Sequence, residues 1–168
     1  MTAPPVWHLA QINIGRLVAP ADDSQVAGFF AELDRINALA ESSDGFVWRL
    51  KGEGNNATDL QPKPDDPLFA INMSVWTDID SLAGFVYRTA HREVMRRRRE
   101  WFAHLRDPYA VVWWVAAGVR PTITDAEERL ASLREHGPTP YAFTVRRPFP
   151  PPGSSAAEPS ADNWFCPA

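Results

Sequence analysis

The stretch Val111-Val112-Trp113-Trp114-Val115 limits the fold of this chain more than any other feature. It has the length and composition of a β-strand, in which side chains alternate between the two faces of a sheet. Here both faces are apolar, so both must be covered. A single layer of helices covers only one face. The other face therefore needs a second layer, either from this chain or from another copy of it.

The rest of the chain supplies three more strands, predicted over residues 7–14, 46–50 and 68–76. Apolar residues at helical spacing predict helices after Asp22, Asp23 and Ser24, after Asp78, from His91 to about His104, and over 122–136. We expect Thr124 and Glu127 to form a capping box on the last helix. Residues 51–67 are polar and rich in proline and glycine, which indicates a long loop.

The order β-α-β-β-α-β is that of the split βαβ arrangement in ferredoxin-like folds. We therefore predict an α+β protein with an antiparallel sheet and helices on one face. To cover the second face we predict a homodimer that packs sheet against sheet and closes a barrel-like core, since burying one Trp side chain contributes about 2–3 kcal/mol. The alternative cover is the last helix, which would allow a monomer. We expect one domain over 1–147 and a disordered Pro/Ser/Ala-rich tail over 148–168.

Composition narrows the class of function. The chain has 168 residues, and its net charge of -4 disfavours a nucleic-acid partner, which requires a positive field. We expect no membrane span, because no run of about 18 apolar residues is present. We also expect no signal peptide, because residues 1–5 lack its basic and apolar regions. No pattern typical of a metal site appears among the four His and the single Cys. Together these features predict a cytoplasmic protein.

A candidate pocket is predicted where one strand faces the arginine-rich helix. Asn72, Ser74 and Trp76 share a strand face by alternation. His91 and Arg98 lie on the apolar stripe of the helix, which also contains Trp101. An amide, a hydroxyl and an indole opposite a histidine and an arginine predict a polar pocket with aromatic walls. We add Asn13, on the first strand, and Tyr87, just before the helix, as ligand-binding candidates.

Two of these residues have both a structural and a functional interpretation. His91 is either a partly buried histidine with a local hydrogen bond or a group that exchanges protons near neutral pH. Arg98 is either paired with an acidic residue such as Asp34 or Glu93, or available to an anionic ligand such as a carboxylate or phenolate. The neighbouring arginines 96, 97 and 99 are expected to be solvated.

Residues from about 7 to 143 resemble a bacterial family of uncharacterised domains. The most specific parts are Asn72-Met-Ser-Val-Trp76 and His91-Arg-Glu-Val-Met-Arg-Arg-Arg-Arg-Glu-Trp-Phe102. That family is similar in layout to the dimeric α+β barrel superfamily, which includes antibiotic-biosynthesis and haem-degrading monooxygenases. In cofactor-independent members, an Asn and a Trp four positions later help to bind and oxygenate a polycyclic phenol. The resemblance thus implies catalytic roles for Asn72, Trp76 and His91.

The resemblance leaves three functions open. The first is a small-molecule-binding protein that acts as a monooxygenase without metal or flavin on an aromatic, polyketide-type metabolite. The second is a non-catalytic binder of the same fold. The third is a haem protein, since haem degraders use a helix histidine, for which His91 is the candidate. Its distance in sequence from Trp76 is longer than we expect for a haem degrader.

Overall fold

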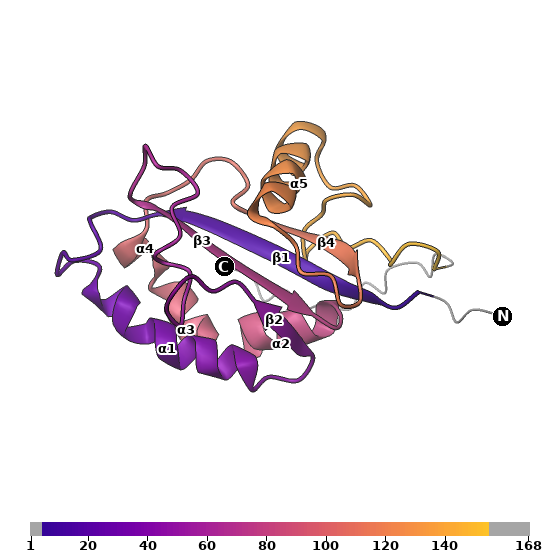
Figure 1. The fold of residues 1–168 in the computed structure, drawn as a ribbon, viewed down its shortest axis with the longest axis horizontal. Coiled ribbons are helices and arrows are strands. Elements are labelled where there is room, and N and C mark those ends of the chain that lie inside the picture. Colours follow the sequence, from indigo (N-terminus) through magenta and orange to yellow (C-terminus); the bar gives the residue numbers. More distant parts are fainter. Residues whose placement is uncertain (1–4, 155–168) are drawn as a thin grey trace.

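The computed structural model describes residues 5–154, which form a four-stranded antiparallel sheet with helices on both sides (Figure 1). The strands, in the spatial order β2-β3-β1-β4, are β1 (Trp7–Arg16), β2 (Phe46–Arg49), β3 (Phe69–Trp76) and β4 (Ala110–Ala116). The helices are α1 (Ala27–Glu41), α2 (Ile79–Arg88), α3 (His91–Arg96), α4 (Arg98–Trp101) and α5 (Ile123–His136). The element order and the sheet order confirm the predicted ferredoxin-like α+β arrangement.

Strand pairing sets the faces of the sheet as alternation predicts. β1 and β3 pair with Asn13 opposite Asn72, and with Leu9 opposite Trp76. These side chains, together with Gln11, point to the side on which α1 to α4 lie, below the strands in Figure 1. We call this side the inner face of the sheet. Its polar residues are concentrated at the centre of the central strand pair.

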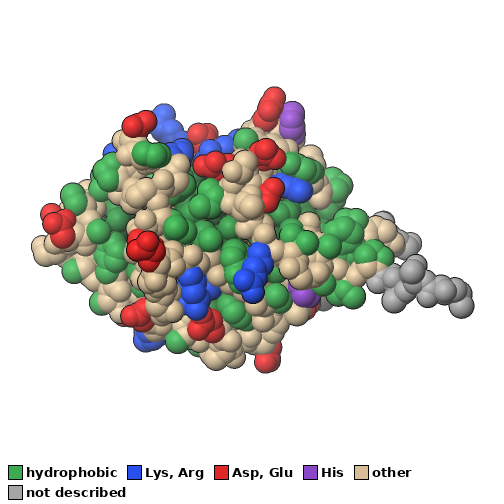
Figure 2. Space-filling view, in the orientation of Figure 1, with side chains coloured by type: hydrophobic (Ala, Val, Ile, Leu, Met, Phe, Trp, Pro, Cys, Tyr) green, Lys and Arg blue, Asp and Glu red, His purple; other side chains and the backbone are tan. Residues whose placement is uncertain are grey.

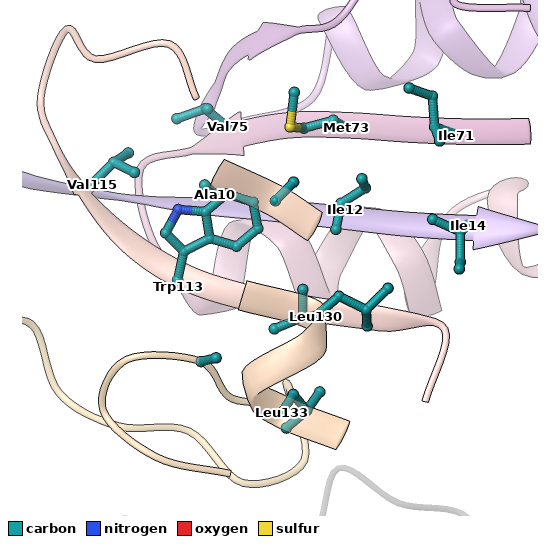
Figure 3. Close-up of a cluster of buried hydrophobic side chains, with 13 residues drawn as sticks. Ala10, Ile12, Ile14, Ile71, Met73, Val75, Trp113, Val115, Leu130 and Leu133 are labelled. Carbon is teal, nitrogen blue, oxygen red and sulfur yellow. The ribbon is translucent and has the colours of Figure 1, made fainter. Parts of the chain in front are cut away.

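The opposite face, which includes one side of β4, is covered by α5. Leu130 and Leu133 of α5 pack against Trp113 and the aliphatic residues of β1 and β3, and Trp113 keeps only 1% of its surface exposed (Figure 3). α5 therefore provides, within one chain, the alternative cover for the second face. The apolar face that led us to expect a sheet-to-sheet homodimer is therefore covered by α5 within one chain. The homodimer itself stays a prediction.

The inner side of β4 is covered by the segment that follows α5. Val112 and Phe143 exchange two backbone hydrogen bonds of 2.9 Å, and Trp114 Nε1 donates to the carbonyl of Phe149 at 2.8 Å. This segment therefore pairs with β4 through a single bridge, between Val112 and Phe143, and adds no further strand to the sheet. Because Phe149 packs on Phe143 with the ring centroids 5.8 Å apart, the packed chain continues past residue 147. The remaining part of the predicted tail, residues 155–168, lies outside the described residues.

The predicted helix from His91 to about His104 is two short helices and ends early. After Trp101 the chain becomes extended and pairs with the end of β1, where Ala103 N–H donates to the carbonyl of Arg16 at 2.8 Å. Phe102 packs over Gly15, where a Cβ would lie 2.5 Å from the Phe102 ring. A glycine in a strand often marks such a close approach. This pairing ends the helix and closes one end of the inner face.

Two helix starts differ from the expected ones. α1 begins at Ala27 without a side-chain cap, because Asp23 accepts from the backbone of Gln25 in the preceding turn. The capping box of α5 consists of Thr122 and Asp125, two residues before the expected pair.

Among residues 5–154, no helix is long and apolar enough to cross a membrane. Hydrophobic side chains reach the surface between α5 and the loop that joins β2 to β3 (Figure 2).

Candidate functional site

A row of hydrogen-bonded polar side chains crosses the inner face of the sheet. Gln11 Nε2 donates to Asn72 Oδ1 at 3.0 Å and to Ser74 Oγ at 2.9 Å. Asn13 Nδ2 donates to Gln11 Oε1 at 3.4 Å, and Trp76 Nε1 donates to Ser74 Oγ at 2.9 Å. The row therefore connects the side-chain amides of Asn13 and Asn72 to the indole of Trp76.

A cavity of about 130 Å³ lies on the helix side of this row. It is enclosed by the sheet, α1, α3–α4 and the β2–β3 loop. Its presence explains why Asn72 is exposed although it lies in an interior strand on the face that helices cover. An engineered apolar cavity of about 150 Å³ accepts benzene, so this cavity suits a small organic molecule. The wall combines aliphatic and aromatic side chains with polar ones, which include Asn13, Asn37, Arg49, Asn72, His91 and Arg98.

A smaller hollow of about 60 Å³ adjoins the cavity and ends at Trp76. The Trp76 ring is fully buried: it stacks on Phe85 at 5.2 Å between centroids and meets Phe46 edge-on at 5.4 Å. Asn72 and His91 line both hollows, so they mark the junction between them. Trp76 forms the closed aromatic end, and its N–H is already engaged by Ser74.

His91 and Trp76 converge on the smaller hollow, with Phe85 between them. The His91 ring lies 4.7 Å from the Phe85 ring, centroid to centroid. Burial lowers the pKa of His91 below its ordinary value of 6.5, and the backbone of Val86 partly opposes this shift. The imidazole is therefore neutral at pH 7, and its buried Nδ1 has no hydrogen-bond partner in the described part of the chain. A neutral imidazole is suited to accept a proton.

Arg98 lies in the cavity wall in an aromatic setting. Its guanidinium carbon is 4.2 Å from the centroid of the Tyr109 ring and 5.1 Å from that of Phe102. Its Nη2 donates to the carbonyl of Ile14 at 3.1 Å. Within residues 5–154 it forms no ion pair with a carboxylate. Burial lowers the pKa of Arg98, partly opposed by Tyr109, but a guanidinium stays charged in proteins.

The two acids suggested as structural partners of Arg98 are engaged elsewhere. Asp34 accepts from Asn55 at 3.1 Å, and Glu93 lies 3.5 Å from Arg96. Neither acid therefore pairs with Arg98, which instead contacts the carbonyl of Ile14 and two aromatic rings.

Sequence reasoning missed several polar residues of the wall, of which Asn37 and Arg49 are the most buried. Asn37 is only 6% exposed, and its amide faces the cavity without a hydrogen bond within the described chain. Arg49 donates to Glu41 at 3.0 Å and to Asn55 at 2.9 Å, which ties the β2–β3 loop over the cavity. The apolar stripe of α1 contains position 37 at helical spacing from Leu33, so a polar residue there was the available signal.

The other predicted site residues, Ser74, Trp101 and Tyr87, differ in where they lie relative to the cavity. Ser74 is buried beneath the cavity as the acceptor of two hydrogen bonds. Trp101 is buried in the cavity wall and packs against Gly28, where a Cβ would lie 3.2 Å from Trp101 Nε1. Tyr87 is 43% exposed and lines neither hollow, so it is not brought to the site.

The residues present do not fit haem. The His91 imidazole is packed on Phe85 at 4.7 Å, and the cavity beside it holds about 130 Å³, close to the size of a benzene site and far below that of a porphyrin. Among the residues that the structure describes, no three His, Cys, Asp or Glu side chains gather as metal ligands.

The chain matches the sequence profile of one protein family, described as a domain of unknown function (DUF3291), over residues 8–159. No curated protein matches it. Similar solved structures include SnoaB, a cofactor-independent oxygenase from Streptomyces nogalater, at 16% identity and a TM-score of 0.39, over 69% of this chain and 96% of that one. A putative antibiotic biosynthesis monooxygenase from Nitrosomonas europaea is 14% identical with a TM-score of 0.42, over 73% and 99% of the two chains.

Proposed function

The chain belongs to the family described as a domain of unknown function (DUF3291), and we propose that it binds a small organic molecule in the cavity above Asn72. The observation that carries the proposal is a hollow with polar groups left for a ligand. Asn72 is exposed inside the fold, and the amide of Asn37 lines the cavity without a hydrogen bond within the described chain. A ligand that supplies partners to these amides would gain roughly 0.5–1.5 kcal/mol for each hydrogen bond.

Cavity-filling substitution tests this proposal. Ala70 lines the cavity from β3, so Ala70→Phe places a ring in it, whereas Ala131→Phe adds the same ring on α5, away from the cavity. Thermal unfolding of the three proteins is followed with a set of aromatic fragments of one and two rings. We expect some fragments to stabilise the unsubstituted protein and Ala131→Phe but not Ala70→Phe. Equal stabilisation of Ala70→Phe, or no stabilisation of any protein, would exclude a ligand in this cavity.

A second candidate is oxygenation without metal or flavin, and the observation that favours it is the neutral His91. We propose that His91 accepts a proton from an acidic C–H of an electron-rich phenolic ligand. Asn13 and Asn72 would hydrogen-bond the enolate oxygen that forms. The resulting carbanion reduces O2: an activated methylene group of a one-ring phenol and one O2 give a ketone and one water. Trp76 and Phe85 would form the wall against which the aromatic system packs.

Oxygen consumption tests this candidate separately from binding. With 4-hydroxyphenylacetone, a one-ring phenol with an activated methylene group, we expect O2 uptake above the buffer rate, with one O2 used for each diketone formed. His91→Phe keeps the aromatic packing but removes the proton acceptor, so the rate should fall at least tenfold. Uptake equal to buffer alone would reject catalysis, while binding by the fragment test would still hold.

The loop, α1 and the sheet of one chain enclose the cavity together. The binding proposal does not depend on whether the chain forms the homodimer expected from the sequence or the monomer that α5 would allow.

A further inference from the structure

We propose that the ligand is a small organic carboxylate with an apolar body, and that Arg98 binds its carboxylate group. This inference rests on the proposed binding function and names the chemical class of the ligand.

The guanidinium of Arg98 packs against two aromatic rings and keeps unused hydrogen-bond donors. Tyr109 and Phe102 contact the group at 4.2 and 5.1 Å from their ring centroids. One N–H is used by the carbonyl of Ile14. The remaining N–H groups have no partner among residues 5–154, and a guanidinium presents such donors as a planar fork that matches a carboxylate at two points.

The charges around the cavity do not neutralise Arg98. Arg49, the other arginine in the wall, pairs with Glu41 at 3.0 Å. Glu32, the acid in the wall, pairs with Arg35. In the described part of the chain Arg98 is thus the charged wall residue without an opposite charge. A half-buried cation of this kind attracts an anion, and the attraction repays the desolvation of both groups where the hydrogen bonds between them are bidentate.

The other residues of the cavity wall limit the size and the polarity of the rest of the ligand. Arg98 lines only the larger cavity, whereas Asn13, Asn37, Asn72 and His91 line both hollows. A carboxylate held at Arg98 therefore directs the rest of the molecule past aliphatic and aromatic side chains toward a polar junction. With about 130 Å³ available, the body is about one ring in size, and a hydroxyl or keto group at its far end would meet the amides.

Matched acid and amide pairs test the proposal on the intact protein. Benzoate with benzamide, phenylacetate with phenylacetamide, and 4-hydroxyphenylacetate with its amide differ in charge while the body stays the same. Titration calorimetry at pH 7 and low salt should give at least tenfold tighter binding for the acid of at least one pair. A direct readout is the Arg98 Nε–H signal in NMR, which should shift with the acid and not with the amide.

Two arginine variants locate the effect. Arg98→Gln keeps hydrogen-bond donors but loses the charge, so the preference for acids should disappear. Arg99→Gln removes a neighbouring exposed charge and should retain the preference, which excludes a general effect of net charge. If Arg98→Gln does not fold, Arg98→Lys keeps the charge without the fork and should weaken acid binding.

Three outcomes overturn the proposal. Amides that bind the unsubstituted protein as tightly as acids would show a neutral ligand site, with the binding function intact. Acids whose preference survives Arg98→Gln would place the anion elsewhere. If no acid binds, but neutral aromatic fragments still bind the unsubstituted protein and not Ala70→Phe, only the carboxylate proposal is rejected. If neither acids nor neutral fragments bind, the proposed binding function is rejected as well.

Discussion

Two buried polar side chains near the inner face should affect the stability of the fold in opposite directions. Ser74 accepts hydrogen bonds from Gln11 and Trp76, at 2.9 Å each, so it satisfies two buried donors. Asn37 is buried to a similar degree but has no hydrogen bond within the described chain. A satisfied polar group stabilises the fold, whereas an unsatisfied one is a cost that function can justify.

Asn37→Leu should therefore stabilise the free protein. Leucine has the branched shape and the number of heavy atoms of asparagine, and it removes an amide that has no hydrogen bond within the described chain, so we expect the free energy of unfolding to rise by up to about 1 kcal/mol. Binding of the best acid should weaken in the same variant. Urea unfolding measures the first effect and calorimetry the second. Ser74→Ala is the matched comparison, and it should lower the free energy of unfolding by about 1–3 kcal/mol. A destabilised Asn37→Leu would mean that the amide has a structural role.

His91 should make stability depend on pH between neutrality and pH 5. Because burial lowers its pKa in the folded protein, the unfolded chain takes up the proton first as the pH falls through about 6.5. Stability is thus fully present above the unfolded value and is lost as the pH falls toward the folded pKa. Urea unfolding from pH 7.5 to 5 should show a weaker dependence in His91→Gln. His136→Gln, at an exposed site, should keep the original dependence.

At the scale of elements, the predictable parts are those that local periodicity determines. Strand alternation placed Asn13, Asn72 and Trp76 on one face, since a strand has only two faces. The helix from His91 was predicted three residues too long, because its end depends on backbone pairing between residues 101–103 and the distant end of β1. Tyr87 is exposed because it lies two residues after the buried Phe85, on the opposite face of α2.

The unpaired state of Arg98 and Asn37 could not be predicted for a related reason. A sequence shows that a polar residue lies on an apolar stripe, but not which partner reaches it. Glu93 was near enough in sequence to pair with Arg98, yet it lies beside Arg96. Partners far apart in the chain, such as Ile14 for Arg98, become visible only in the assembled fold.

The start of α5 provides a test at the element scale. Thr122 accepts from Asp125 N–H at 3.1 Å, and the Asp125 carboxylate accepts from the Thr122 backbone at 2.9 Å. These bonds hold the pKa of Asp125 below its ordinary value, so the stabilisation is present above about pH 4 and is lost as the pH falls through the folded pKa.

Thr122→Ala should lower the free energy of unfolding by about 0.5–2 kcal/mol at pH 7, with a smaller difference at pH 3. Thr124→Ala, at the position that the sequence suggested for the cap, should change it by less than about 0.5 kcal/mol. Urea unfolding of both variants at the two pH values decides between the two boxes. A larger loss for Thr124→Ala would restore the original prediction.

At the scale of the whole molecule, the question is whether one chain covers its own sheet. α5 buries the face of β4 that motivated a homodimer, and Ile12, Met73 and Val75 on the same face are each 1% exposed in the single chain. The centre of that face is therefore buried within one chain. Subunit association makes an unfolding midpoint rise with protein concentration, whereas a monomer gives a constant midpoint.

We therefore expect a concentration-independent midpoint and the mass of one chain in light scattering. Leu130 is the key contact of α5, so Leu130→Ala should lower the free energy of unfolding by about 2–5 kcal/mol. Ala131→Ser, on the exposed side of the same helix, should have little effect. If the loosened α5 uncovers the sheet face, Leu130→Ala should also self-associate at high concentration, because the apolar strand must be covered by some layer. A midpoint of the unsubstituted protein that rises with concentration would instead favour the sheet-to-sheet dimer, with α5 as only a partial cover.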